Sequence, residues 1–238
     1  MARQILSDAE ILSSNQFYLG RRDGLDWNFE EKLFNEVKDY GLGGLIRKRL
    51  ERYGGKERFS FFWDKASPFA QWYQTSFRGS VYTIVNPDLL PDEFSAERQF
   101  TSTEQFMMYN KALLFLDRET AAAIMKTDNP REQKALGRQV KNFDEAVWQF
   151  ARSEIVLRGN RFKFSQNEDI KYSLLETEGT TIVEASPYDK IWGIGLAESD
   201  DRAHNRSTWQ GLNLLGEILT ELREEMLRPT SQNARGNS

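Results

Sequence analysis

The spacing of apolar positions predicts a run of helices through the middle and end of the chain. Thr101 and Glu104 fit a capping box, and Asn129 followed by Pro130 supplies a cap and a first helical residue. Leucine and isoleucine side chains share one face of a final amphipathic helix. The predicted helices span residues 101–115, 118–126, 129–137, 145–164, 167–177 and 214–222.

Aromatic and β-branched runs predict a few short strands. Residues 59–63 are almost all aromatic and suit a buried strand, and residues 180–185 are β-branched. Residues 71–77 and 81–85 are expected to form two strands around a turn at 78–80. Helices with a small sheet place the chain in the α+β class.

The ends of the chain differ from this central region. Residues 1–58 read as an N-terminal helical arm, and residues 229–238 have the composition of a disordered tail. Glycines at 41, 43 and 44 break the helical pattern; no strand precedes them, so they do not form a dinucleotide-binding loop. We expect one compact, mostly helical domain over residues 59–228.

Composition limits the chemistry. Among 238 residues there is no Cys and one His, which excludes disulfides, a thiolate nucleophile, Cys-type zinc sites and metal sites built on two imidazoles. A Ser-His-Asp triad would have to use His204, which lies among charged residues and reads as a surface histidine. The chemistry therefore rests on carboxylates, amines and hydroxyls, and we expect no metal and no cofactor.

Charge and hydropathy bear on partners and location. The chain has 32 basic and 36 acidic residues, which argues against extended non-specific duplex binding. It has no apolar run long enough to span a bilayer and no signal-peptide core, so a cytoplasmic protein without membrane contact is expected. The segment 47–58 carries six basic against two acidic side chains. It is either a solvated helix face or an edge that contacts phosphate.

One predicted helix places Glu104 and Lys111 on the same face, because residues seven apart differ by about two full turns. Two interpretations fit. The lysine stem lies on the core rim with its head in water, or neighbouring apolar side chains desolvate the amine. A desolvated amine is neutral near pH 7 and is able to attack an electrophilic sugar carbon.

Two further segments carry candidate chemistry. Glu184 and Asp189 flank a Ser-Pro turn, a pattern compatible with acid–base work on a glycosidic bond or with an ordinary acidic loop. Trp192, between glycines, is either a ring that stacks on a base or a core tryptophan. The segment 211–216 opens the last helix, where free backbone N–H groups suit a phosphate; alternatively, Asn213 caps that helix.

Taken in order, five motifs of this chain resemble the NADAR, or YbiA-like, family over about residues 59–228. They are SPFAQWY at 67–73, TEQF at 103–106 continuing through Lys111, LGR at 136–138, DKIWGIG at 189–195, and GLNLLG at 211–216 continuing through 221–223. The resemblance implies a compact α+β fold that cleaves N-glycosidic bonds. It implies either ribosylamino-pyrimidine phosphates of riboflavin synthesis or ADP-ribosylated guanine as substrate.

The resemblance also implies site residues. Lys111 matches the lysine that forms a Schiff base with ribose C1, and Glu104 and Asp189 match motif carboxylates. The matching substrate-binding positions are Ser67, Phe69, Trp72, Trp192, Gly193, Asn213 and Gly216. Departures from the riboflavin-type pattern are Pro68, Ile194 and Leu214, which replace polar residues.

These observations give a leading hypothesis and alternatives. The leading one is an N-glycosidase that removes ADP-ribose from guanine in nucleotide or nucleic acid, with Trp192 or Trp72 stacking on the base. The alternatives are an N-glycosidase of riboflavin intermediates and a non-catalytic module that binds ADP-ribose or NAD. A purely structural role, with the arm as an oligomer contact, is a further possibility, and the oligomeric state is left open.

Overall fold

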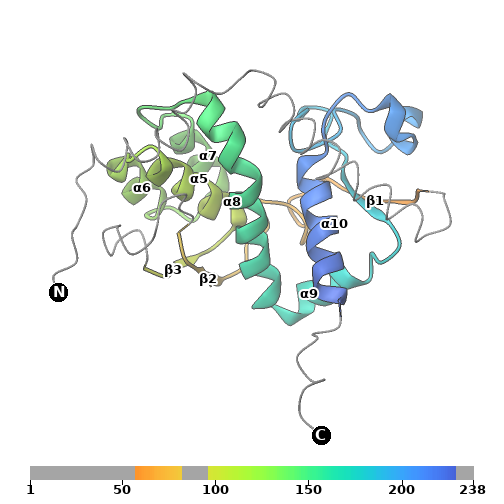
Figure 1. Cartoon of the computed structure of the whole chain (residues 1–238), viewed down its shortest axis with the longest axis horizontal. Coiled ribbons are helices and arrows are strands. Elements are labelled where there is room, and N and C mark those ends of the chain that lie inside the picture. The colour runs from red at the N-terminus through yellow and green to blue at the C-terminus, as the bar shows by residue number, and fades with distance from the viewer. Residues whose placement is uncertain (1–56, 82–95, 229–238) are drawn as a thin grey trace, which may run out of the picture. The chain divides into compact units, whose positions relative to one another are not determined.

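The computed structural model describes residues 57–81 and 96–228 (Figure 1). They form two compact units, one of residues 71–81 with 96–163 and one of residues 57–70 with 164–228, and each is described by itself. Nearly all of the expected N-terminal arm, the expected strand after Val81 and the tail lie outside the described residues.

The first unit is mostly helical. Helix α5 packs against both α6 and α7, which also contact each other (Figure 1). Strands β2 and β3 pair antiparallel, with Phe77 opposite Phe100. The elements are β2 (Phe77–Gly79), β3 (Arg98–Phe100), α5 (Thr103–Leu114), α6 (Arg118–Ile124), α7 (Pro130–Gly137) and α8 (Glu145–Ser165).

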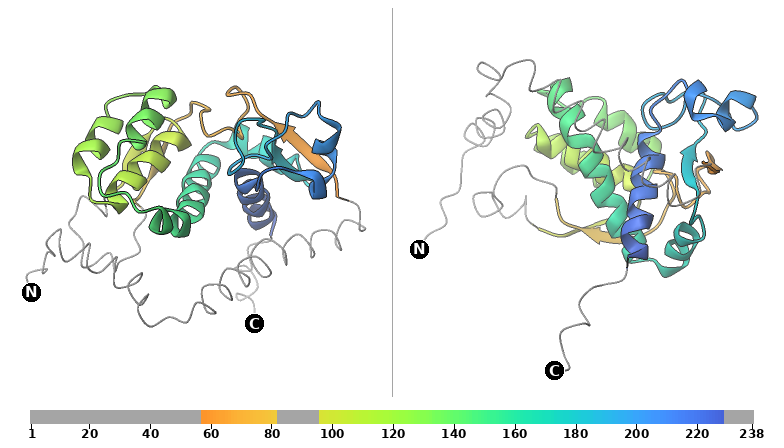
Figure 2. Two further views of the ribbon diagram at one scale, coloured as in Figure 1. Left: turned by 90° about the horizontal axis from the view of Figure 1, so that it is seen from above. Right: turned by 45° about the vertical axis from the view of Figure 1, so that its right-hand side comes forward.

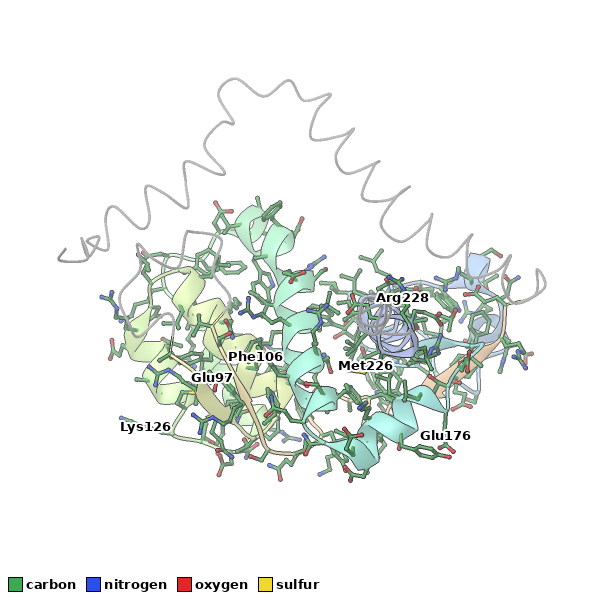
Figure 3. The ribbon with its side chains drawn as sticks, turned by 60° about the horizontal axis from the view of Figure 1, so that its bottom comes forward. Glu97, Phe106, Lys126, Glu176, Met226 and Arg228 are labelled. Atoms are coloured by element: carbon green, nitrogen blue, oxygen red, sulfur yellow. The ribbon has the colours of Figure 1, made fainter. Side chains whose placement is uncertain are left out.

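Aromatic rings fill the core of this unit. Phe106 is fully buried among the side chains of the unit (Figure 3). Its ring centroid lies 5.0 Å from that of Phe100 and 6.0 Å from that of Phe162. Helix α8 approaches closely at Gly159, where a Cβ would lie 2.7 Å from the Phe106 ring. The missing side chain of Gly159 is therefore part of how α5 and α8 pack.

The hairpin predicted over residues 71–85 is wrong in its described part. Arg78 and Gly79 belong to strand β2 and not to a turn, and β2 pairs with residues 98–100. Phe77 and Gly79 are buried while Arg78 is exposed, which is the alternation of a strand with one covered face. The partner strand lies about twenty residues away, so local turn signals misassigned this segment.

The helix predictions of the first unit are confirmed, with one shift at a cap. The cap of α5 is Ser102 and not Thr101, because the Ser102 hydroxyl accepts the Gln105 N–H at 3.1 Å. The side-chain oxygen of Gln105 accepts from the Thr101 N–H in return. Asn129 caps α7 as predicted, accepting from the Arg131 N–H at 3.0 Å.

The second unit is built on two parallel strands. Strand β1 (Phe59–Phe62) pairs with β4 (Thr181–Glu184), and α10 (Leu214–Leu227) contacts both β4 and α9 (Glu168–Leu175) (Figure 2). Met226 and Arg228 mark the end of α10 in Figure 3. Two short 3₁₀ turns, η4 (Asp201–His204) and η5 (Arg206–Thr208), lie in the predicted loop.

Both strands and both helices of this unit are confirmed, and the chain is α+β and mostly helical. The expectation that residues 59–63 are buried is confirmed only at Phe62: residues 59–61 are half-buried, and Trp63, which follows β1, is 58% exposed. The apolar stripe of α10 faces inward, with Leu215, Leu219 and Leu222 fully buried. No helix in the described part of the chain is long and apolar enough to cross a membrane.

Candidate active site

The amine of Lys111 lies in an enclosure of aromatic rings in the first unit. Lys111 is in the last turn of α5, and its Nζ donates to the carbonyl oxygen of Gly137 at 2.8 Å. Nζ also lies 4.3 Å from the ring centroid of Phe143 and 5.4 Å from that of Trp148. The side chain is half-buried, so the amine is partly shielded from water yet reachable.

Burial lowers the pKa of Lys111 below its ordinary value. The carboxylate of Glu145 acts in the opposite direction and raises this pKa, while the guanidinium of Arg138 adds to the lowering. A lowered pKa increases the fraction of neutral amine near pH 7, which is the form that attacks carbon. The surroundings are thus those of a desolvated lysine and not of a head fully in water.

Glu104 lies on the same helix but is almost completely buried, at 2% exposed. Its backbone N–H donates to the Gln71 carbonyl at 3.0 Å, in the first turn of α5. A rise of 1.5 Å per residue puts it about 10 Å along the axis from Lys111. Trp72 is half-buried, and the Lys134 amine lies 5.9 Å from its ring centroid.

The sequence did not single out Phe143, Trp148 or Glu145. All three come from the start of α8 or the residues before it. No local pattern marks them, because they reach Lys111 only through the packing of separate segments.

A second lysine with a perturbed amine also escaped the sequence reasoning. Lys163 on α8 is fully buried, and burial lowers its pKa to about 7. Its Nζ lies 5.3 Å from the ring centroid of Tyr73. It differs from Lys111 in exposing no surface, so a substrate has no direct approach to its amine.

In the second unit, Asp189 organises its own loop. Its Oδ1 accepts from the N–H groups of Ile191 at 2.9 Å and Trp192 at 2.8 Å. The backbone of Gly193 passes close to β4, since a Cβ there would lie 2.8 Å from the Glu184 carbonyl oxygen. The Oδ1 atom of Asp189 therefore holds the backbone of the half-buried Trp192 in place.

The helix start at Asn213 does not match either interpretation from the sequence. The N–H groups of residues 213, 214 and 215 donate to the carbonyls of residues 193, 191 and 192, so these three donors are not available to a phosphate. Asn213 has a left-handed backbone (φ 54°), and its side chain makes no cap hydrogen bond. The anion-site prediction is wrong here because the preceding loop folds back onto the helix.

Asn213 instead connects α10 to β4. The side-chain amide donates to the Ile182 carbonyl at 3.0 Å and accepts from the Glu184 N–H at 3.0 Å. Gly216 touches the same strand, since a Cβ there would lie 2.1 Å from the Ile182 oxygen. Both residues are buried, so they support the loop that carries Trp192 and do not present atoms to solvent.

Ser67 and Phe69 also have structural contacts in the second unit. The Ser67 hydroxyl accepts from the Phe69 N–H at 3.3 Å, and the Phe69 ring contacts Phe62 at 5.6 Å between centroids. His204 is exposed, as expected, and its ring meets Phe61 edge to face. Within residues 57–81 and 96–228, no group of three or more His, Asp or Glu side chains is arranged to hold a metal ion.

The predicted residues are thus divided between the units. Lys111, Glu104 and Trp72 belong to the first unit, in which Lys111 has the enclosed amine. The others belong to the second unit, in which the loop at 189–195 and the start of α10 are joined by backbone hydrogen bonds.

Comparison with known proteins identifies the family. The NADAR domain model matches residues 61–227. Protein irg-1 of Caenorhabditis elegans is 40% identical over 172 residues, which are 71% of this chain and 79% of the relative. N-glycosidase R617 of Acanthamoeba polyphaga mimivirus is 44% identical over 157 residues, 66% of this chain and 86% of the relative.

A weaker match and a solved structure extend the comparison. The riboflavin biosynthesis protein PYRR of Zea mays is 33% identical over 46% of this chain and 16% of its own length. The NMR structure of Escherichia coli YbiA has the same fold, with a TM-score of 0.53 and 20% identity over 72% of this chain and 86% of YbiA. The chain therefore belongs to the NADAR domain family and is an enzyme of the N-glycosidase class.

Proposed function

We propose that this N-glycosidase removes ADP-ribose from ADP-ribosylated guanine, through a Schiff base between Lys111 and C1 of the ribose. The observation that carries the proposal is the Lys111 amine, which lies against two aromatic rings and has a lowered pKa. A module that only binds ADP-ribose has no need for a partly desolvated amine, so this observation favours catalysis over binding alone.

The reaction needs one water molecule in total. The lone pair of the Lys111 amine forms a bond to C1, the bond between C1 and the guanine nitrogen breaks, and its electron pair leaves with the base. A proton from a carboxylic acid neutralises the departing base. The amine loses a proton, the ribose ring opens to a Schiff base, and water hydrolyses it to free ADP-ribose and lysine.

Three carboxylates are candidates for the proton transfers. Glu104 and Asp189 are the residues that match the family motifs. Glu145 adds a third, because its charge acts directly on the pKa of Lys111. Replacing each by its amide, with the rates of base release and of Schiff-base hydrolysis measured separately, assigns the donor to the variant that slows the first step.

Riboflavin intermediates are the second candidate substrate, favoured by the match to PYRR. One sequence argument against them loses weight, because Ile194 is fully buried in a cluster with Val183, Leu196 and Ala203. The isoleucine at this position fills a core and need not reflect a lost substrate contact. The preference for ADP-ribosylated guanine rests on the other two departures from the riboflavin-type pattern, Pro68 and Leu214, and on the basic segment at 47–58.

Borohydride trapping tests the proposal. The protein is incubated with ADP-ribosylated guanine nucleotide or with a ribosylamino-pyrimidine phosphate, reduced, digested and examined by mass spectrometry. We expect a sugar adduct on the Lys111 peptide with the first substrate. Lys111→Arg keeps the positive charge beside the rings but removes the nucleophile, so it should form no adduct and release no base.

Lys163→Met is the matched control, since it removes the other lysine of lowered pKa. An adduct on Lys163, or base release at the wild-type rate in Lys111→Arg, would refute the mechanism. An adduct formed only with the pyrimidine substrate would refute the guanine substrate and leave the mechanism standing.

A further inference from the structure

Two large aromatic side chains lie exposed beside the Asp189 loop of the second unit, and the mechanism uses neither. Trp63 is 58% exposed and Tyr188 is 87% exposed. Their ring centroids are 6.4 Å apart at an interplanar angle of 44°. The rings are thus neighbours without stacking face to face, which leaves ring surface open to a planar partner.

The position of this pair follows from the parallel strands. Trp63 comes directly after β1, and Tyr188 comes four residues after β4, whose last residue Glu184 pairs with Phe62. Both side chains therefore leave the same edge of the strand pair, where the carboxyl ends meet. Ligands of α/β sheets commonly bind at such an edge.

The loop that carries Tyr188 is also the one that positions Trp192. Asp189, the next residue, fixes this loop through the two backbone N–H groups that its Oδ1 accepts. A ligand on the Trp63–Tyr188 pair would thus contact the loop of the family motif directly, at a place that the proposed reaction leaves free.

Each of the two segments also offers an exposed cation to a phosphate backbone. Lys65 and Lys190 are exposed and each follows its aromatic residue by two positions. The nearby Asp64 carboxylate accepts from the Ala66 N–H at 2.7 Å, and Asp189 accepts within its own loop. These two acids balance the charge of the two lysines, so the rings and not a net positive charge are the main contribution to binding. Exposed rings beside lysines are the arrangement that binds single-stranded nucleic acid without reading its sequence.

We propose that Trp63 and Tyr188 form a stacking platform for a base of the nucleic acid that carries the modified guanine, so that the preferred substrate is single-stranded nucleic acid and not a free nucleotide. This rests on the proposed function for the identity of the modified base. The net-acidic chain is compatible with it, because a platform of this size contacts only a few phosphates.

The first test is direct binding. An unmodified, fluorescently labelled 12-nucleotide single strand, as DNA and as RNA, is titrated with the full chain and binding is followed by anisotropy. We expect Trp63→Ala and Tyr188→Ala each to weaken binding about 5- to 100-fold, the range of single base–aromatic stacks. Tyr172→Ala is the matched control, because Tyr172 is a 64% exposed tyrosine on α9 of the same unit. The affinity of this variant for the single strand should stay within about twofold of the wild-type affinity.

The second test compares substrates. The kcat/KM for an ADP-ribosylated guanine within an oligonucleotide is divided by that for the free modified nucleotide. In Trp63→Ala and Tyr188→Ala this ratio should fall by a similar factor, whereas Tyr172→Ala should keep the wild-type ratio.

The outcomes separate the two proposals. Aromatic-dependent binding of the single strand without any release of ADP-ribose supports the platform and refutes the proposed substrate. Release of ADP-ribose with a ratio that neither aromatic variant changes refutes the platform and supports the substrate. The platform is also refuted if the wild-type chain does not bind the single strand, or if it binds duplex equally well.

Discussion

Replacing Asn213 tests whether this motif residue stabilises the fold or binds the substrate. The sequence places Asn213 at a phosphate-binding helix start, but the structure buries it completely between α10 and β4. Its amide donates to the Ile182 carbonyl and accepts from the Glu184 N–H, both at 3.0 Å. Asn213→Ala therefore removes two hydrogen bonds of β4 and no solvent-facing group.

The expected loss is the sum of two effects. Each backbone group left without its partner in a buried place costs about 1–3 kcal/mol. Alanine at φ 54° costs about 1 kcal/mol more, because a Cβ disfavours the left-handed region. The free energy of unfolding should fall by about 3–7 kcal/mol, out of a total of about 5–15 kcal/mol for a typical domain. Asn213→Gly loses the same hydrogen bonds, but glycine adopts the left-handed backbone without cost. Its loss in the free energy of unfolding should therefore be about 1 kcal/mol smaller than that of Asn213→Ala.

Urea unfolding followed by circular dichroism measures these changes. Asn205→Ala is the control, because Asn205 is an exposed cap that accepts from the Ser207 N–H, and its loss should cost about 1 kcal/mol. If the free energy of unfolding of Asn213→Ala is within about 1 kcal/mol of wild type and KM rises instead, Asn213 acts on the substrate and does not hold the fold.

The remaining predictions concern charge. Glu145 raises the pKa of Lys111, so Glu145→Gln should move the acidic limb of the pH–rate profile to lower pH. Arg138 lowers the same pKa, so Arg138→Gln should move that limb to higher pH. Shifts of both variants in the same direction would contradict this assignment. Arg206 bridges to Glu217, a carboxylate only 1% exposed, at 2.7 Å. Arg206→Ala should therefore cost about 2–4 kcal/mol in urea unfolding, and Arg206→Lys should restore only part, since a lysine lacks the two-pronged geometry.

Patterns local in sequence predicted local structure well. The helices from α6 to α10 and the strands β1 and β4 were found from apolar spacing, β-branched runs and caps. These signals are reliable because a helix forms its backbone hydrogen bonds within itself and because its apolar stripe must face a core. The hairpin at 71–85 failed for the opposite reason, since β2 takes its partner from residues 98–100.

The sequence by itself also determined the chemical inventory and the family motifs, and with them the choice of Lys111. Only the tertiary structure decided what surrounds that amine and what the other motif residues do. Phe143 and Trp148 meet Lys111 through packing between α5 and the start of α8. Asn213 and Gly216 became supports of β4 because the loop before α10 folds back and takes up the helix N–H groups. A residue type fixes which bonds are possible, whereas burial and partners, which depend on distant segments, fix which of them form.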